Sequence, residues 1–156
     1  MNKSDIYQST AEAILAVLDG EPNVTARMAT VSCLLSQAFP DRFFWTGFYC
    51  VDPDKSKELI VGPYQGTLGC LRIPFGRGVC GMAAATGETQ IVKDVHAIEN
   101  HIACDSRSNS EIVVPVYGAD QKLIAVFDVD STQVAAFDET DKTHLEDILN
   151  KVFSKG

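Results

Sequence analysis

The stretch IVVPVYGADQKLIAVFDV, residues 112–129, decides the fold. Its two ends, 112–116 and 123–129, are dominated by β-branched and other apolar residues, which favour strands. The turn GADQ, residues 118–121, separates these runs. Two strand-forming runs joined by a short glycine-containing turn predict an antiparallel hairpin.

Three further strands are predicted upstream of this hairpin. Residues 43–51 (FFWTGFYCV) and 59–64 flank the charged turn DPDKSK, so they form a second predicted hairpin, and residues 90–92 form a short strand. Helices are predicted at both ends of the chain. The first is capped by Ser4, the second ends at Pro40, a short one covers residues 78–86, and the last begins near Asp138. This order of elements predicts an α+β fold, with an antiparallel sheet packed against helices, in a single domain over residues 1–156.

Composition restricts the class of protein. The chain carries a formal net charge of −8, and an acidic surface repels phosphate backbones, so nucleic acid is not an expected partner. No stretch approaches the roughly 18 apolar residues of a membrane span. The N-terminal sequence MNKSDIYQST lacks the apolar run of a signal peptide. We therefore expect a cytoplasmic protein with no membrane contact.

The five cysteines are the most informative residues for function. In a reducing compartment they are packed thiols, metal ligands or redox groups. Cys33 and Cys50 lie in a predicted helix and strand, where packing is the favoured interpretation. The other three lie in a polar, glycine-rich middle segment, where a thiol can meet solvent, and spacing alone leaves packing and catalysis equally open: Cys70, Cys80 and Cys104.

A zinc site is the alternative for this middle segment, since His96 and His101 lie close to Cys104 in sequence. However, the segment contains no C-x-x-C pair, and the gap between Cys70 and Cys80 exceeds the usual spacing of zinc ligands. We therefore expect no metal. Arg107 is a candidate for stabilising a thiolate at Cys104.

An acidic cluster forms the second candidate group. Asp128 and Asp130 alternate along one strand, so they face the same side of the sheet, and Glu111 enters the neighbouring strand. Like charges held close together raise the pKa of at least one member, which then donates a proton near neutral pH. Carboxylates at a solvated strand end are the alternative interpretation.

Several segments resemble the GAF-domain free methionine-(R)-sulfoxide reductases. The similar stretches are PYQG, GCLRIPFGRGVCG, DVHAIENHIACDSRSNSEIVVP and FDVDS, and the resemblance extends from about Tyr7 to Phe153. Its most specific part is HIACDSRSNSEIVVP, together with the spacing of the three middle cysteines. The resemblance implies a GAF-like central antiparallel sheet of about six strands, flanked by helices and carrying a closed pocket over one face.

The resemblance also implies residue roles. Cys104 matches the nucleophile and Cys70 the principal resolving cysteine. Cys80 matches a third cysteine near the pocket, which is a candidate alternate resolving cysteine. The acidic residues match groups that bind the substrate ammonium and assist departure of the sulfoxide oxygen: Glu111 and Asp128 as binding residues, and Asp130 as a candidate proton donor. Trp45 matches an aromatic wall for the S-methyl end. Backbone N–H groups near Ile102 and Ala103 are candidates for binding the substrate carboxylate.

These roles imply a thiol enzyme that reduces free methionine sulfoxide through a sulfenic acid at Cys104 and a disulfide with Cys70. Thioredoxin is the implied reductant, and no bound cofactor is needed because the electrons arrive through cysteine. The oligomeric state is left open, with a homodimer as one option. Two alternatives remain, a non-catalytic GAF domain that binds a small molecule and a redox-sensing switch.

Overall fold

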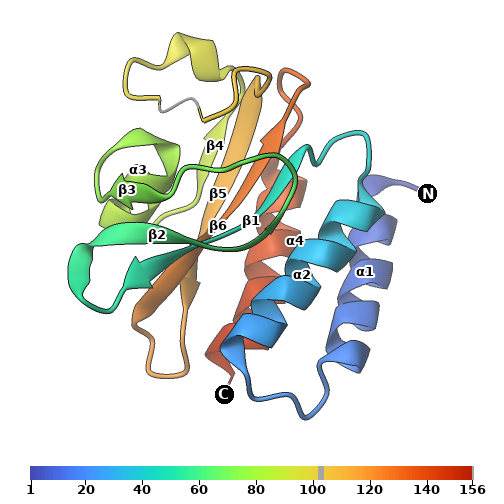
Figure 1. Ribbon diagram of the computed structural model, residues 1–156. Coiled ribbons are helices and arrows are strands. Elements are labelled where there is room, and N and C mark those ends of the chain that lie inside the picture. Colours follow the sequence, from blue (N-terminus) through green and yellow to red (C-terminus); the bar gives the residue numbers. More distant parts are fainter. Residues whose placement is uncertain (102–103, 156) are drawn as a thin grey trace.

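A six-stranded antiparallel sheet forms the centre of the computed structural model, which describes residues 1–101 and 104–155 (Figure 1). The strands follow the order β3-β2-β1-β6-β5-β4, and every neighbouring pair is antiparallel. Their bounds are β1 Trp45–Asp52, β2 Lys55–Gln65, β3 Arg72–Pro74, β4 Gln90–Val92, β5 Ser110–Tyr117 and β6 Leu123–Ser131.

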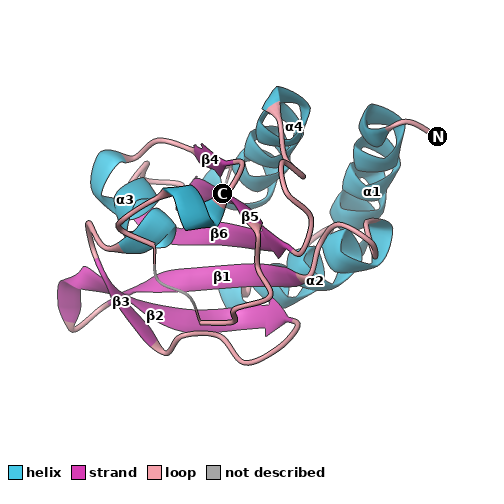
Figure 2. Cartoon of the chain, turned by 90° about the horizontal axis from the view of Figure 1, so that it is seen from above, coloured by secondary structure: helices cyan, strands magenta, loops and turns pink. Residues whose placement is uncertain are grey.

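The helices divide unequally between the two faces of this sheet. Three of them, α1 (Lys3–Val17), α2 (Val24–Ala38) and α4 (Glu139–Leu149), cover one face, and a π-helical turn, Asn150–Ser154, extends α4. The short helix α3 (Gly78–Thr86) lies over the other face, together with long loops and a 3-10 turn at Val95–Ala97 (Figure 2). The second face therefore has room for a pocket.

Alternation along β6 assigns its side chains to these two environments. Phe127 and Val129 belong to the core beneath α1, α2 and α4, whereas Val126 packs beneath α3. Successive side chains of a strand point to opposite faces. Asp128 and Asp130 therefore share one face, as the sequence predicted, and the structure shows that this is the face covered by α3.

The predicted α+β fold is confirmed, with several local differences. The turn predicted at residues 52–57 is shorter than expected, because β1 extends to Asp52 and β2 already begins at Lys55. Strand β3 was not predicted, because it ends in a proline and lies in a glycine-rich segment, and both features indicate a loop. The predicted N-cap of α1, Ser4, was wrong. The Asn2 side chain caps the helix by accepting a hydrogen bond from the Asp5 N–H. In the described part of the chain, no helix combines the length and the apolar character needed to cross a membrane.

Candidate active site

A pocket lies on the α3 side of the sheet, where strands β1, β5 and β6 meet the loops that carry Cys70 and Cys104. Its lining combines aromatic, sulfur and acidic side chains. Those predicted from the sequence are Trp45, Cys80, Cys104, Glu111, Asp128 and Asp130. The structure thus brings into one cavity residues that are up to 85 positions apart, between Trp45 and Asp130.

Strand register explains why the three acids converge. Glu111 on β5 lies directly opposite Asp130 on β6, and Asp128 follows on the same face of β6. Glu111 and Asp128 are only 5% and 3% exposed. Burial raises the pKa of each of the three carboxyls well above its ordinary value, and the charge of a neighbouring acid raises it further.

One oxygen atom of these acids lacks a hydrogen-bonding partner. The Oδ1 atom of Asp128 is buried, and no donor reaches it from the described residues. An unsatisfied buried acceptor is rare in folded proteins and costs about 1–3 kcal/mol. The arrangement therefore suits a ligand that brings a positive charge and N–H donors to the acids.

An aromatic wall closes the pocket beside the acids. The Trp45 ring stacks on Tyr49, with ring centroids 5.4 Å apart, and on Tyr64, with centroids 4.8 Å apart. Its Nε1–H donates to the Thr67 carbonyl oxygen over 2.9 Å. A Cβ atom at Gly69 would lie 2.9 Å from this ring, so the absence of a side chain there allows the loop to approach the wall.

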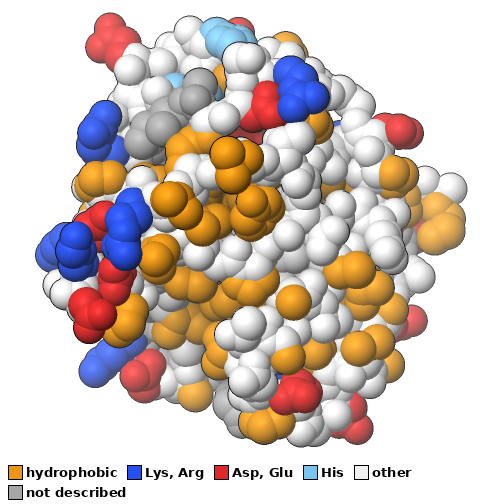
Figure 3. Space-filling view, in the orientation of Figure 1, with side chains coloured by type: hydrophobic (Ala, Val, Ile, Leu, Met, Phe, Trp, Pro, Cys, Tyr) orange, Lys and Arg blue, Asp and Glu red, His pale blue; other side chains and the backbone are white. Residues whose placement is uncertain are grey.

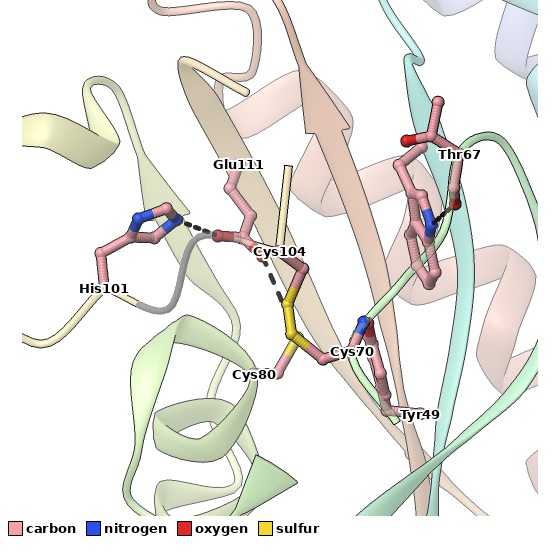
Figure 4. Close-up of a disulfide and its surroundings, with 8 residues drawn as sticks. Tyr49, Thr67, Cys70, Cys80, His101, Cys104 and Glu111 are labelled. Carbon is pink, nitrogen blue, oxygen red and sulfur yellow. Dashed lines mark hydrogen bonds and ion pairs between the residues drawn. A yellow bond between two sulfur atoms is a disulfide. The ribbon is translucent and has the colours of Figure 1, made fainter. Parts of the chain in front are cut away.

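Cys70 and Cys104 are joined by a disulfide, with their Cα atoms 5.5 Å apart (Figure 4). Two hydrogen bonds hold the loops in place. The Tyr49 hydroxyl accepts from the Cys70 N–H over 3.1 Å, and the Thr67 hydroxyl donates to Asp105 Oδ2 over 2.8 Å. The bond between Thr67 and Asp105 and the role of Tyr49 were not predicted, because both join segments that lie far apart in the sequence.

Arg107 contacts Asp105 instead of serving Cys104 as the sequence suggested. Its guanidinium donates to both carboxylate oxygens, over 3.0 and 2.8 Å, and lies 5.0 Å from the centre of the Phe44 ring. These hydrogen bonds are the main reason why the pKa of Asp105 lies well below its usual range. Arg107 thus stabilises the loop that follows Cys104.

Cys80 lies at the base of the pocket, on α3. Its Sγ is 3.9 Å from Glu111 Oε2, and burial raises the pKa of the thiol. Three side chains here could together hold a metal ion. Each offers one ligand atom, and these atoms lie within 4.8 Å of one another: Cys80, Glu111 and Asp128. On the other side of the pocket, His101 Nε2 approaches Glu111 Oε1 to 3.8 Å, and burial lowers the pKa of this histidine.

The zinc ligands considered from the sequence do not assemble. Cys70 and Cys104 bond to each other, and His96 Nε2 pairs with Asn109 Oδ1 over 2.9 Å. Ile102 and Ala103, the candidates for binding a substrate carboxylate, lie outside the described residues. Their role, and the individual roles of the other site residues, stay predictions.

Comparisons with known proteins place the chain in a family. The family described as GAF domain matches residues 33–152. Over 149 residues the chain is 41% identical to the free methionine-R-sulfoxide reductase of Escherichia coli (strain K12). The aligned region covers 96% of this chain and 87% of that protein.

Two solved structures agree with this result. The free methionine-R-sulfoxide reductase of Neisseria meningitidis, solved in complex with its substrate, is 45% identical and superposes with a TM-score of 0.92, covering 99% of this chain and 90% of that chain. The reduced form of the Staphylococcus aureus fRMsr is 40% identical with a TM-score of 0.88, covering 96% of this chain and 94% of that one. The chain belongs to the GAF-domain family of free methionine-R-sulfoxide reductases.

Proposed function

We propose that this protein reduces the (R)-sulfoxide of free L-methionine to methionine, using Cys104 as nucleophile and thioredoxin as reductant. The observation that carries the proposal is the position of the disulfide. The Cys70–Cys104 bond lies beside a pocket that also contains three acids and an aromatic wall. A redox centre, an ammonium site and an apolar surface are the three features that this substrate requires.

The acids account for a preference for the free amino acid. Glu111 and Asp128 bind the substrate ammonium, which supplies donors to the unpartnered Asp128 Oδ1. A methionine inside a peptide has no ammonium, so one or both carboxylates would stay buried without a counter-charge, at a cost of about 3–5 kcal/mol. Trp45 contacts the S-methyl end, and backbone N–H groups of Ile102 and Ala103 bind the carboxylate.

The chemistry balances with two thiols per turnover. The Cys104 thiolate attacks the sulfoxide sulfur, while Asp130 or Glu111 protonates the sulfoxide oxygen. The protonated oxygen then passes from the methionine sulfur to Cys104 Sγ as the bond between the two sulfurs breaks, so methionine leaves and Cys104 is left as a sulfenic acid. The Cys70 thiol then attacks the Cys104 sulfur, and the oxygen departs as water. One sulfoxide and two thiols thus give one methionine, one disulfide and one water, and a dithiol restores the enzyme.

The test is a turnover assay coupled to thioredoxin, thioredoxin reductase and NADPH. We expect reduction of free methionine-R-sulfoxide, and little with the S epimer or with N-acetylmethionine sulfoxide, whose amide carries no charge. Cys104→Ser should abolish turnover, whereas Cys70→Ser should form about one methionine per protein and then stop. The matched control is Cys33→Ser, which replaces a half-buried thiol on α2. Binding of the free R-sulfoxide without turnover would overturn the proposal and favour a sensor.

A further inference from the structure

The segment that carries Cys70 displays an exposed apolar surface, which we call the Leu68–Leu71 surface after the two residues that form it. Leu68 is 80% exposed and Leu71 is 71% exposed, and in the described part of the chain only Met1 exceeds them among large hydrophobic residues. Figure 3 shows hydrophobic side chains gathered on this face, over the loop that follows β2. Single exposed leucines are common, but two of them that flank a redox-active sulfur indicate a contact surface.

The backbone of the same segment has unused hydrogen-bonding groups. Residues 68–70 form no helix or strand. The Cys70 N–H is bound by the Tyr49 hydroxyl, which fixes the position of the cysteine. By contrast, the N–H and C=O groups of Leu68 and Gly69 bond to none of the described residues. A segment with free main-chain N–H and C=O groups can pair with the backbone of a partner.

The charged residues near the Leu68–Leu71 surface indicate which kind of protein binds there. The chain as a whole carries a net charge of −8. Arg77, however, is exposed at the start of α3, borders the same pocket as Leu68, and forms no ion pair with any described residue. Arg77 lines the same pocket as Cys104 and is not held by an ion pair within the described chain, so its guanidinium can attract a carboxylate on a partner that approaches this side of the molecule.

We infer that the Leu68–Leu71 surface is the docking site of an acidic protein with two vicinal thiols, which reduces the disulfide by attacking Cys70. This inference rests on the proposed function, which requires the disulfide to be reduced after every turnover. The occupant must bring a thiolate to a sulfur atom of the disulfide. The two leucines lie on either side of Cys70 in the chain, so a protein seated on them has its reactive thiol beside that residue.

The exchange proceeds in two balanced steps. The first thiolate of the partner forms a bond to Cys70 Sγ, the bond between Cys70 and Cys104 breaks, and Cys104 leaves as a thiolate. The second thiol of the partner then attacks the partner's first sulfur, which is bonded to Cys70. A disulfide forms within the partner, and Cys70 is released as a thiol. Two electrons pass from the partner to the enzyme. Attack at Cys70 releases first the sulfur that lines the substrate pocket.

The test compares a protein reductant with a small one. In the variant Leu71→Ser, we expect the KM for thioredoxin to rise about tenfold or more, while turnover driven by dithiothreitol stays within twofold of the parent. Adding Leu68→Ser should lower the ratio of thioredoxin-driven to dithiothreitol-driven turnover further. The control is Val17→Ser, which removes a 63% exposed side chain from α1 on the opposite side of the sheet. An unchanged KM for thioredoxin in the double variant would overturn the docking site.

A trapping experiment tests the direction of attack separately. Thioredoxin that lacks its second cysteine should form a stable mixed disulfide with the oxidised enzyme, and peptide mapping should find it on Cys70. A mixed disulfide on Cys104 would contradict the inference. If dithiothreitol itself drives no reduction of methionine sulfoxide by the parent protein, the proposed function fails, which is a different result from either of these.

Discussion

Replacing Asp128 by asparagine should make the protein more stable and a worse enzyme. The side chain is 3% exposed, and burial, followed by the charge of Asp130, raises its pKa. One oxygen of Asp128 lies within 4.8 Å of one of Glu111. At an effective dielectric constant of about 20, two full charges at this distance repel by about 3.5 kcal/mol. Asp128→Asn removes this repulsion with almost no change in shape.

The effect has a defined dependence on pH. A carboxyl whose pKa is raised in the folded protein binds its proton more tightly there than in the unfolded chain, so its contribution to stability is greatest at low pH. That contribution falls as pH rises above about 4, the ordinary value for aspartate, towards the raised value. Parent and Asp128→Asn should therefore unfold alike at pH 3.5, and the variant should be more stable by about 1–3 kcal/mol at pH 8.

Urea unfolding of the oxidised protein at both pH values measures this difference, and in a domain of this size it corresponds to a rise of about 3–10 °C in Tm. Under the proposed function, the same variant should lose about 30-fold or more in kcat/KM, because a charged partner of the ammonium is missing. The exposed Asp19, in the turn after α1, provides the control Asp19→Asn. A variant that is less stable than the parent at pH 8, or equally stabilised at both pH values, would refute the electrostatic reasoning.

Two further substitutions test how the cysteine loops are positioned. Thr67→Val removes the hydroxyl that donates to Asp105, so we expect a loss of about 1 kcal/mol in stability and slower closure of the disulfide. Counting free thiols at intervals after one turnover measures the rate of closure. Closure at the parent rate would show that this bond does not hold the loops. Gly69→Ala would place a Cβ atom 2.9 Å from the Trp45 ring and 3.0 Å from the Tyr49 hydroxyl. We therefore expect the KM for the sulfoxide to rise several-fold in steady-state assays. An unchanged KM would count against the aromatic wall as a substrate contact.

Local patterns were sufficient to predict most of the fold. The hairpin that contains β5 and β6 was predicted from two apolar runs and a short turn, and α3 and β4 were predicted with the bounds that the structure shows. Strand β3 was missed because Arg72–Pro74 ends in a proline within a glycine-rich segment, and its pairing with β2 joins residues that are not neighbours in the sequence. Local sequence cannot report such a pairing.

The candidate site was predictable to the same extent. Alternation along one strand placed Asp128 and Asp130 on one face. The polar, glycine-rich middle segment singled out three cysteines, and the resemblance supplied their roles. The contacts that hold these groups were not predictable, because each joins segments far apart in the sequence: Tyr49 to Cys70, Thr67 to Asp105, and His101 to Glu111. The error on Arg107 has the same origin, since its neighbours in sequence suggested a thiolate while its side chain lies on Asp105.

The unequal covering of the sheet explains how acids can be tolerated in a buried strand. Beneath α1, α2 and α4, side chains such as Phe127 and Val129 are sealed by helices, and an acid there would have no means of meeting a ligand. On the opposite face, Asp128 and Asp130 line a pocket together with Cys104, where a ligand can reach them. The same strand can therefore alternate core residues with acids that serve a binding site.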